Sequence, residues 1–569
     1  MDTVLSMPSL HWIGKEKVIN HHLDVPYRVL DHQYTFNGSQ TAEVFEVKGE
    51  TGNKIIHGDN LEALKSLLPE YEGKIKCIYI DPPYNTGNEG WVYNDNVNDP
   101  KLKKWLGQVV GKETEDMTRH DKWLCMMYPR LKLLHKLLAE DGVIFISLDE
   151  VETTHLRCIM NEIFGENNFI AQITLLCNPK GRSQDKYFST NHEYITVFSK
   201  DKLPKDSFSI TKEEDLIEKE YKLKDQKGRY RLMELRNTHR EFSKDNRPNL
   251  FYPFYINPEN GEVSLIKNED FQIECKPLWP DGFEGCWTWG KELSAKDSHL
   301  LIAQNIRGNW KIFRKSYSAG IEGENVKRKL FTIWSDSKFY TEKGQIVFGE
   351  IFSGLNKNDF PQPKSVDLVT EVLRTNTRDG DIILDSFAGS GTTAHAVLNL
   401  NKLDGGKRKF ICIEMENYAE TITAERVKRV SKGYGDKEGT GGSFDYYELG
   451  PALFNDDNEI NELVGVEKLR QYIYYTETKG VLNSPFEGGV RRTGDANDNE
   501  FLLKKHNDTA YYFYYEQDGI TTLNHEFLST IKTKAEQYVI YADNCLLTKE
   551  FMTKHKIIFK KIPRDITKF

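Results

Sequence analysis

The chain has 569 residues, of which 38% are hydrophobic, 12% aromatic and 29% charged. This composition excludes a wholly disordered or collagen-like chain, and at roughly 150 residues per domain the length allows about four domains. The formal net charge is −9, so a nucleic-acid-binding function would depend on a local basic surface and not on the charge of the whole chain.

The sequence shows no sign of a membrane or secreted protein. No apolar run approaches the roughly 20 residues that a membrane helix needs, and the N-terminus lacks the basic and apolar regions of a signal peptide. The eight cysteines lie far apart and form no Cys-x-x-Cys pair, so we expect neither a zinc site nor a disulfide framework. We therefore expect a cytoplasmic protein in a reducing compartment.

After an irregular N-terminal segment over residues 1–50, short apolar strands alternate with segments of helical periodicity. Strands are expected at 54–57, 77–80, 143–146 and 194–198, and helices at about 61–68, 123–138 and 151–163. This alternation is typical of an α/β fold with a parallel sheet covered on both faces. The strand at 77–80 ends in Asp81-Pro82-Pro83-Tyr84, and two adjacent prolines favour a loop there.

The alternation stops over residues 201–355, where charged and aromatic residues are interleaved. Two windows within this segment are basic: the first includes Arg236 and Arg240, and the second Arg314, Lys327 and Arg328. A charged segment is often only a solvated face. Two basic windows in an acidic chain favour a surface that contacts phosphates.

The α/β pattern returns over residues 356–435. A helix is expected at 365–374, strands at 381–385 and 410–413, and a helix from Thr392. The glycine-rich segment 433–442 is typical of a linker, and we expect residues 445–569 to form a separate mixed α and β domain.

The loop after the strand at 381–385 is rich in glycine and small polar residues. Glycines at this place let the backbone approach a ligand, and the following helix presents free N–H groups at its N-terminus. Glu414 ends the next strand, where a carboxylate can accept hydrogen bonds from ribose hydroxyls. The segment 389–394 also fits a dinucleotide-binding pattern with alanine last, so an NAD-type oxidoreductase or a plain tight turn remains open.

The Asp81-Pro82-Pro83-Tyr84 segment has the chemistry to hold a planar exocyclic amine. The Asp81 carboxylate and the Pro82 carbonyl can accept the two amine hydrogens, which makes the nitrogen lone pair available for attack. Tyr84 can stack on the base. The prolines fix the acceptors before the reaction, so their orientation costs little entropy.

These two motifs carry a resemblance. Asp81-Pro82-Pro83-Tyr84 together with Asp385-x-Phe387-x-Gly389-x-Gly391 resembles the S-adenosylmethionine-dependent amino-methyltransferases of DNA. The catalytic motif precedes the cofactor motif, which is similar to the circularly permuted β-class arrangement. The stretches 58–64, 84–87, 118–123 and 360–365 resemble the modification (Mod) subunits of Type III restriction–modification systems, and the resemblance covers roughly residues 50–435.

The resemblance implies a Rossmann-like methyltransferase fold. Its sheet would have seven mostly parallel strands closed by an antiparallel pair, divided into a catalytic half (51–200) and a cofactor-binding half (356–435). The segment 201–355 would be an inserted target-recognition domain. Residues 445–569 would be an α+β domain for dimerisation or partner docking.

The resemblance also implies roles for individual residues. Asp59 with Asn60 would meet the adenine of the cofactor, Lys364 with Ser365 its methionine end, and Glu414 its ribose. The rest of the cofactor pocket would be Asp385, Ser386, Phe387, Ala388, Gly389, Gly391 and Thr392. Asp81, Pro82, Pro83 and Tyr84 would hold a flipped target base. Candidate DNA contacts are Asn85, Arg236, Arg240, Arg314, Lys327 and Arg328.

The expected function is therefore site-specific methylation of the adenine N6 amine in double-stranded DNA, by base flipping and direct in-line transfer from S-adenosylmethionine without a metal. Family members act as homodimers with an ATP-dependent restriction (Res) subunit. The alternatives are an N4-cytosine enzyme, a protein or RNA amine methyltransferase, an NAD-type oxidoreductase and an inactive DNA-binding subunit. An aspartate at position 81, where serine is common in N4-cytosine enzymes, favours adenine.

Overall fold

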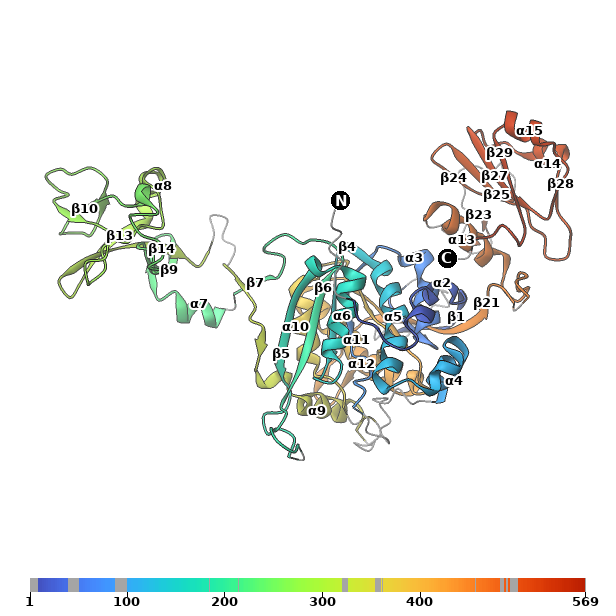
Figure 1. The fold of residues 1–569 in the computed structure, drawn as a ribbon, viewed down its shortest axis with the longest axis horizontal. Helices are drawn as coiled ribbons and strands as arrows, with labels where there is room; N and C mark the ends of the chain where they lie inside the picture. The colour runs from blue at the N-terminus through green and yellow to red at the C-terminus, as the bar shows by residue number, and fades with distance from the viewer. Residues whose placement is uncertain are drawn as a thin grey trace. The chain divides into compact units, whose positions relative to one another are not determined.

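The computed structural model describes residues 9–38, 51–86, 100–183, 185–212, 214–319, 326–353, 360, 362–455, 457–480, 482, 486–487, 490–491 and 500–567. The chain forms two compact units (Figure 1). One unit is residues 208–330, and the other contains everything before and after it. No helix among the described residues is long and apolar enough to cross a membrane.

The larger unit is built around one sheet that has ten strands in the described part of the chain. In spatial order these are β1 (Arg28–Asn37), β21 (Ser443–Ala452), β2 (Lys54–His57), β18 (Lys409–Glu414), β17 (Ile382–Asp385), β3 (Ile75–Ile80), β4 (Leu138–Leu148), β6 (His192–Ser199), β5 (Phe169–Leu176) and β16 (Ile333–Trp334). From β2 to β4 neighbouring strands are parallel, whereas β6 is antiparallel to both β4 and β5.

This arrangement confirms the α/β sheet that the sequence predicts. Six strands lie where the sequence predicts them, and β5, which the sequence analysis did not place, completes the seven strands from β2 to β5 that the resemblance implies. The count of seven is too low because β21 and β1 extend one edge and β16 extends the other. The central strand β3 is buried at five of its six positions, as a parallel strand covered on both faces must be.

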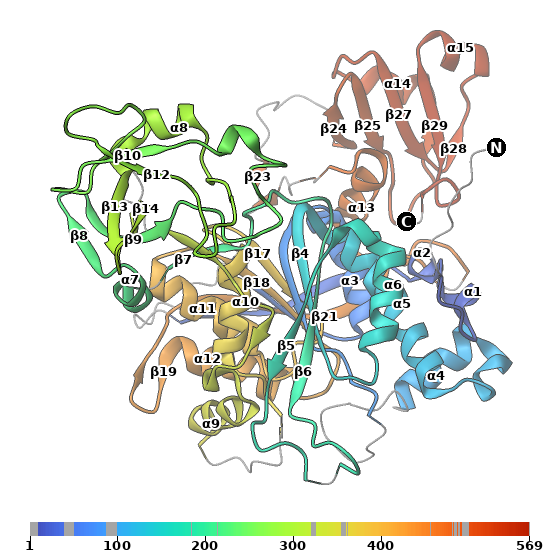
Figure 2. The ribbon, with the colours of Figure 1, turned by 60° about the vertical axis from the view of Figure 1, so that its left-hand side comes forward.

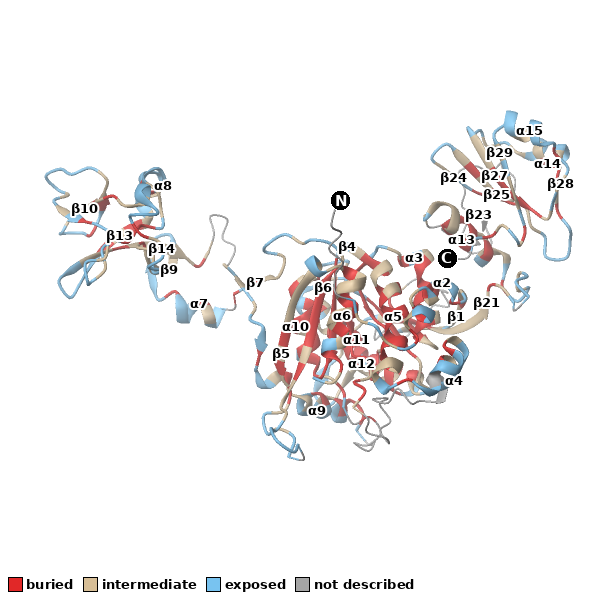
Figure 3. Ribbon diagram, viewed as in Figure 1, coloured by how far each residue is buried: buried red, intermediate tan, exposed pale blue. Residues whose placement is uncertain are grey.

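Two helical layers cover the sheet (Figure 2). One layer contains α3 (Asn60–Tyr71), α5 (Arg119–Leu137) and α6 (Thr153–Phe164), and the other α10 (Val366–Asn376), α11 (Thr392–Asp404) and α12 (Glu425–Lys432). Beside the first layer lie the short α1 (Lys15–Val18), α2 (His21–Asp24) and α4 (Pro100–Val109), and α9 (Thr341–Ile351) packs against α12. The buried residues gather along the sheet and the inner helix faces (Figure 3).

The boundaries of this unit differ from those expected. β1 comes from the N-terminal segment, and β21, which includes the start of the expected C-terminal domain, pairs with both β1 and β2. The glycine-rich segment before β21 forms a small hairpin of β19 (Gly433–Tyr434) and β20 (Lys437–Glu438). Strand pairing over long sequence distances decides these boundaries, and local composition does not reveal it.

The part of the larger unit that follows β21 has its own sheet. Its strands are β24 (Leu502–His506), β25 (Thr509–Phe513), β27 (Gln537–Ala542) and β29 (Ile557–Lys561), accompanied by α13 (Val466–Thr478), α14 (His525–Thr530) and α15 (Lys549–Lys554). Short pairs are formed by β26 (Thr522–Leu523) with β28 (Asn544–Cys545) and by β22 (Phe486–Glu487) with β23 (Val490–Arg491). Two apolar clusters lie on this sheet.

The smaller unit is a β-rich body. It has a four-stranded antiparallel sheet of β13 (Leu301–Ile306), β14 (Asn309–Tyr317), β9 (Gly228–Glu234) and β8 (Leu223–Asp225), and a three-stranded sheet of β11 (Val263–Ser264), β10 (Phe254–Ile256) and β12 (Ile273–Cys275). The remaining elements are α7 (Glu214–Glu220), α8 (Lys291–Lys296) and the pair β7 (Ser209–Thr211) and β15 (Lys327–Lys329). Its aromatic core contains Tyr252, Phe254 and Trp287. The insert expected at 201–355 is wider than this unit because β16 and α9 belong to the larger one.

Candidate functional site

The two loops singled out in the sequence line one pocket in the larger unit. Because β3 and β17 are adjacent and parallel, their carboxyl ends meet at the same edge of the sheet. The pocket there is lined by Tyr79, Asp81, Phe360, Gln362, Pro363, Lys364, Asp385, Phe387, Ala388, Gly389, Ser390, Thr392 and Thr393. Residues that lie about 300 positions apart in the sequence therefore form one cavity.

At one side of the pocket, Lys364 lies among three acidic or phenolic groups. Its Nζ is 2.7 Å from Oε2 of Glu193 and 3.4 Å from Oδ1 of Asp81. It also donates a hydrogen bond to the hydroxyl of Tyr84, whose own hydroxyl donates to Glu193 over 3.0 Å. The Nζ atom lies 4.8 Å from the centre of the Tyr84 ring. The cation therefore ties the Asp81–Tyr84 loop to β6, which carries Glu193.

Burial and charge act in opposite directions in this cluster. Burial raises the pKa of Asp81 to about 6, although the nearby Lys364 lowers it. Burial also disfavours the charged forms of Glu193 and Lys364, but their ion pair outweighs it: the pKa of Glu193 is lowered and that of Lys364 is raised well above its usual value. The ammonium of Lys364 is therefore present at neutral pH, beside a carboxyl that titrates in the weakly acidic range.

The glycine-rich loop has the backbone conformation that its composition indicates. Gly389 and Gly391 have φ angles of 52° and 79°, which favour glycine over residues with a Cβ. A Cβ added at Gly391 would lie 3.0 Å from the backbone oxygen of Thr423. Gly391 is also the N-cap of α11, so the first turn of this helix follows the loop directly. The glycines thus let the loop pack closely against the segment that contains Thr423.

Two carboxylates, those of Asp385 and Glu414, accept hydrogen bonds from the backbone of the glycine-rich loop. Asp385 accepts from Phe387 N over 3.0 Å and from Thr393 Oγ1. Glu414 accepts from Gly389 N over 2.7 Å and, through its other oxygen, from the backbone of the residue two positions later. Burial raises the pKa of each carboxyl to about 7. Both are within the buried wall of the site, and only Asp385 is part of the lining itself.

Three of the other expected cofactor contacts, Asp59, Asn60 and Ser365, make contacts outside the pocket lining. Asp59 caps α3 by accepting from the backbone of Leu61 over 2.8 Å. The Asn60 side chain donates to the backbone oxygen of Ser386 over 3.1 Å and accepts from Arg130 over 2.6 Å, so it links α5 to the glycine-rich loop. The Ser365 hydroxyl donates to the backbone oxygen of Lys338. None of these three residues lines the pocket.

The structure adds charged residues that the sequence analysis did not select. Arg426 on α12 is fully buried, and its Nη1 donates to Ser390 Oγ over 2.6 Å and to Thr392 Oγ1 over 2.9 Å. Burial lowers its pKa to about 10. Arg130 and Arg426 each lie within an apolar helical stripe, where a charged residue was the available signal. Glu193 lies just before the strand predicted at 194–198, so no local signal marked it.

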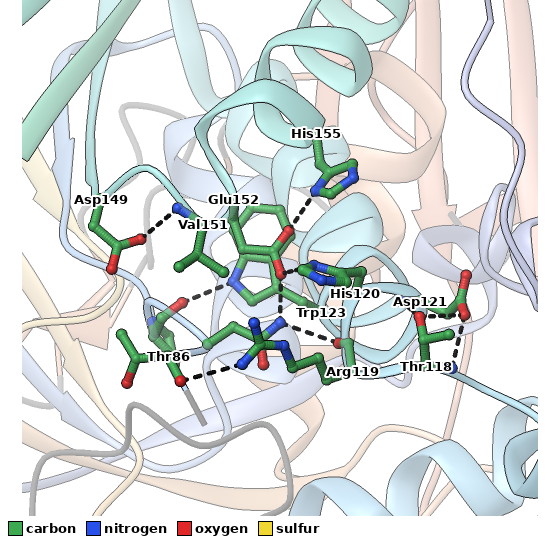
Figure 4. Close-up of polar contacts among 12 residues, drawn as sticks. Thr86, Thr118, Arg119, His120, Asp121, Trp123, Asp149, Val151, Glu152 and His155 are labelled. Atoms are coloured by element: carbon green, nitrogen blue, oxygen red, sulfur yellow. Dashed lines mark hydrogen bonds and ion pairs between the residues drawn. The ribbon is translucent and has the colours of Figure 1, made fainter. Parts of the chain in front are cut away.

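The chain after Tyr84 is held by α5 and by the start of α6 (Figure 4). Asn85 has a left-handed backbone with φ of 62°, and its amide donates to Oε1 of the fully buried Glu152. Arg119 donates from Nη1 to the backbone oxygen of Thr86 over 3.1 Å. Trp123 donates to the backbone oxygen of Pro83 over 2.7 Å. Asn85, expected as a DNA contact, is thus buried and used inside the loop.

Two histidines complete the surroundings of Glu152. Nδ1 of His120 lies 2.7 Å from Oε1, and Nδ1 of His155 lies 2.8 Å from Oε2 (Figure 4). The atoms of these three residues that could ligate a metal ion lie within 4.8 Å of one another. The sequence analysis did not anticipate this cluster. The separations are those of hydrogen bonds, so each carboxylate oxygen is held by an imidazole.

The candidate DNA-contacting residues of the smaller unit are mostly paired with acids or aromatic rings. Arg236 and Arg240 form ion pairs of 2.8 and 2.6 Å with Glu234 and Asp281, and both lie over the ring of Trp279. Other members of this group are Arg314, which lies on β14 near Met233, and Lys327 and Arg328 on β15. Nearby acidic residues therefore neutralise part of the positive charge of the basic windows that the sequence shows.

Residues 75–425 match the family described as DNA methylase. The chain is 35% identical over 431 residues to the Mod subunit of the Type III restriction-modification enzyme EcoPI of Escherichia phage P1, which covers 72% of this chain and 63% of that protein. It is 34% identical over 385 residues to the Type II methyltransferase M.KpnI of Klebsiella pneumoniae, with coverages of 67% and 84%. It is 28% identical over 494 residues to the EcoP15I Mod subunit of Escherichia coli, with coverages of 79% and 73%. The chain thus spans less than two thirds of the length of the EcoPI relative.

Proposed function

Because this chain belongs to the DNA methylase family, we propose that it transfers a methyl group from S-adenosylmethionine to the N6 amine of adenine in double-stranded DNA. The observation that carries the proposal is the shared pocket. It joins a loop suited to hold a planar amine, at Asp81, to a glycine-rich loop suited to hold a nucleoside, at Asp385–Thr393. An enzyme of this class needs both ligands side by side, since the methyl passes directly from one to the other.

The residues of the pocket fit the proposed cofactor. The glycine-rich loop brings backbone atoms to the cavity, Phe387 supplies an apolar surface and Lys364 a cation for a carboxylate. The buried hydroxyl of Ser386, which lies between the lining residues Asp385 and Phe387 in the chain, has no hydrogen-bond partner among the described residues. When bound, S-adenosylmethionine supplies an electrophilic methyl group on a sulfonium centre. We assign Glu414 to the ribose side, where its carboxylate already orders Gly389.

We assign the amine-binding role to Asp81 and the Pro82 carbonyl. An adenine extruded from the duplex would donate its two N6 hydrogens to these acceptors, and the ring of Tyr84 would stack on the base. Both hydrogen bonds draw the nitrogen lone pair away from conjugation with the ring. Asp81 and the Pro82 carbonyl would thus present the amine lone pair in line with the electrophilic methyl group that the bound cofactor would supply. The surplus amine proton passes to Asp81 or to solvent.

The relatives favour a modification subunit. The EcoPI and EcoP15I proteins are named as Mod subunits of Type III restriction-modification enzymes. We propose the same role here, with a homodimer and an ATP-dependent restriction partner. We further propose that the unit 208–330 recognises the target sequence and that the sheet around β25 and β27 serves dimerisation or partner docking.

A second candidate is methylation of the N4 amine of cytosine. The acceptor geometry at Asp81 suits either exocyclic amine, and the description of the matched family, DNA methylase, names neither. The two candidates differ in their product, N6-methyladenine or N4-methylcytosine, which nucleoside analysis of digested DNA distinguishes.

Single-molecule methylation mapping of DNA from cells that express this chain alone tests the proposal. We expect one short motif with N6-methyladenine on one strand in the wild type and no modified motif with Asp81→Ala. Purified Asp81→Ala should still bind S-adenosylmethionine, because the glycine-rich loop is unchanged. A modified motif that persists in Asp81→Ala would contradict the assignment of Asp81. N4-methylcytosine instead of N6-methyladenine would favour the second candidate.

A further inference from the structure

The turn between β5 and β6, residues 177–191, displays two aromatic side chains to solvent. Tyr187 is 83% exposed and Phe188 is 92% exposed. The two rings are neighbours in the chain, and exposed apolar groups that lie together are a feature of interaction sites. Both residues lie in the larger unit, on the connection between two strands of the central sheet.

Internal hydrogen bonds fix the shape of this turn. The backbone N–H of Arg182 donates to the oxygen of Thr190 over 2.9 Å, and the Ser189 hydroxyl donates to the oxygen of Arg182 over 2.9 Å. The backbone N–H of Thr190 donates to the Asp185 carboxylate over 2.7 Å, which lowers the pKa of that carboxyl. The aromatic pair is therefore presented by an ordered turn.

The turn is also basic. It carries Lys180, Arg182 and Lys186 against the single carboxylate of Asp185. Among the described residues, none of the three cations forms an ion pair, in contrast to Arg236 and Arg240 of the smaller unit. Lys186 Nζ lies 5.1 Å from the centre of the Tyr187 ring, so one cation already accompanies one of the exposed rings. Cations without an ion-pair partner beside exposed rings are the combination that binds nucleic-acid backbone and bases together.

A groove lined in part by the turn shares one lining residue with the catalytic pocket. Asn178, Lys180 and Arg182 line one wall of the groove, and Tyr340 and Gln345 line another part of it. Gln362 lines both this groove and the pocket that contains Asp81. Glu193 also lines the groove and accepts hydrogen bonds from Tyr84 and Lys364. Glu342 lines the groove as well, and a ligand bound along the turn would lie beside the amine-binding site.

We propose that the turn 177–191 is a DNA-binding element of the catalytic unit. Its cations contact the phosphates beside the target nucleotide, and Tyr187 and Phe188 stack against the bases next to the extruded one. This stacking replaces part of the base stacking that flipping removes, so it favours the flipped state. The inference rests on the proposed function, and it assigns DNA contacts outside the unit 208–330.

The test uses the full chain and a duplex that carries the motif found by methylation mapping, with 2-aminopurine at the target position. In the variant Tyr187→Ala/Phe188→Ala we expect the fluorescence gain on binding to fall several-fold and kcat/KM to fall about tenfold or more, with S-adenosylmethionine affinity unchanged. Leu403→Ala is the matched control, because Leu403 is 75% exposed on α11. It should behave as wild type.

A charge variant supplies a second readout. Lys180→Gln/Lys186→Gln should weaken binding to specific and non-specific duplexes alike and reduce the salt dependence of the affinity. Wild-type fluorescence and kcat/KM in the aromatic variant would overturn the inference. So would a change of oligomeric state with normal methylation, because the turn would then be a protein interface. If the wild type itself methylated no DNA, the proposed function would fail together with this inference.

Discussion

Lys364 Nζ lies 2.7 Å from Oε2 of Glu193, and these two residues are 171 positions apart in the sequence. The ion pair is nearly buried, with side-chain exposures of 14% and 10%. A buried pair of this kind gives little net stability, and its value lies in the position that it imposes. Here it holds a cation beside Asp81 and a hydrogen-bond acceptor beside Tyr84.

Replacing Lys364 by methionine should affect both the chemistry and the stability, because removing one partner of a buried ion pair leaves the other charge uncompensated. Without the cation, the pKa of Asp81 rises further and the buried Glu193 carboxyl is left without its ion-pair partner. We expect the acid limb of the pH profile of kcat/KM to shift upward by about one pH unit or more. The matched control is Lys437→Met, which removes an exposed lysine paired with Glu350. An unchanged acid limb in Lys364→Met would show that the lysine does not influence Asp81.

The wild type should lose activity on acidification. Burial raises the pKa of Asp81 to about 6, and only the ionised carboxylate accepts from the amine without a competing proton. The rate of methyl transfer should therefore increase with pH up to about 6 and stay constant at higher pH. Single-turnover rates between pH 5 and 8, at saturating S-adenosylmethionine, measure this limb. A rate that stays flat down to pH 5 would mean that Asp81 carries its charge throughout or that its ionisation is not needed.

The parts of this site that the sequence predicts are those fixed by local chemistry. Adjacent prolines after a buried strand require a loop at Asp81–Tyr84, and glycines before a helix require the open backbone at Gly389 and Gly391. The parallel α/β pattern then places both loops at one edge of the sheet. For this reason the meeting of the two motifs follows from the sequence, although about 300 residues separate them.

Contacts that depend on tertiary packing could not be predicted in this way. No local sequence pattern marks Glu193, and Arg426 is marked only as a charged residue in an apolar stripe; the roles of both emerge only when β6 and α12 are in place. Asn85 continues the loop motif, yet its amide is turned inward to Glu152. The strand β21 joins the central sheet only because β1 and β2 offer it two partners. Each of these depends on side chains or strands far away in the sequence.

The raised pKa of Glu414 should make the fold less stable as pH increases. Burial raises this pKa from its ordinary 4.5 to about 7, so between these values the folded state holds a proton that the unfolded state has lost. Stability therefore decreases as the pH rises from about 4.5 to 7. In Glu414→Gln the slope of Tm against pH over this range should become shallower, even if Tm is lower overall because one hydrogen bond to the backbone is lost. Identical slopes in both proteins would contradict the shift.

Glu152 should act as a positioning residue for the catalytic loop. Its carboxylate accepts from the Asn85 amide while two imidazoles hold its oxygens, and Asn85 has a left-handed backbone at this point. Glu152→Gln keeps one acceptor oxygen and replaces the other by an NH₂ donor, so the three contacts to Asn85, His120 and His155 cannot all be kept, and we expect kcat to fall about 10- to 100-fold while KM for S-adenosylmethionine is unchanged. Glu162→Gln, on the same helix, is the control because Glu162 pairs with Lys15 away from the loop.

The kcat-against-KM comparison distinguishes positioning of the loop from general loss of structure, since misfolding would reduce the fraction of protein that binds the cofactor. Adding a chelator distinguishes hydrogen bonding among these side chains from metal binding by them. If His120, Glu152 and His155 act through hydrogen bonds, as their 2.7 and 2.8 Å separations indicate, EDTA should leave wild-type kcat unchanged. Loss of activity with EDTA and recovery with Zn²⁺ would instead show that the three side chains hold a metal ion. If kcat were equal in Glu152→Gln and the wild type, Glu152 would have no role in positioning the loop.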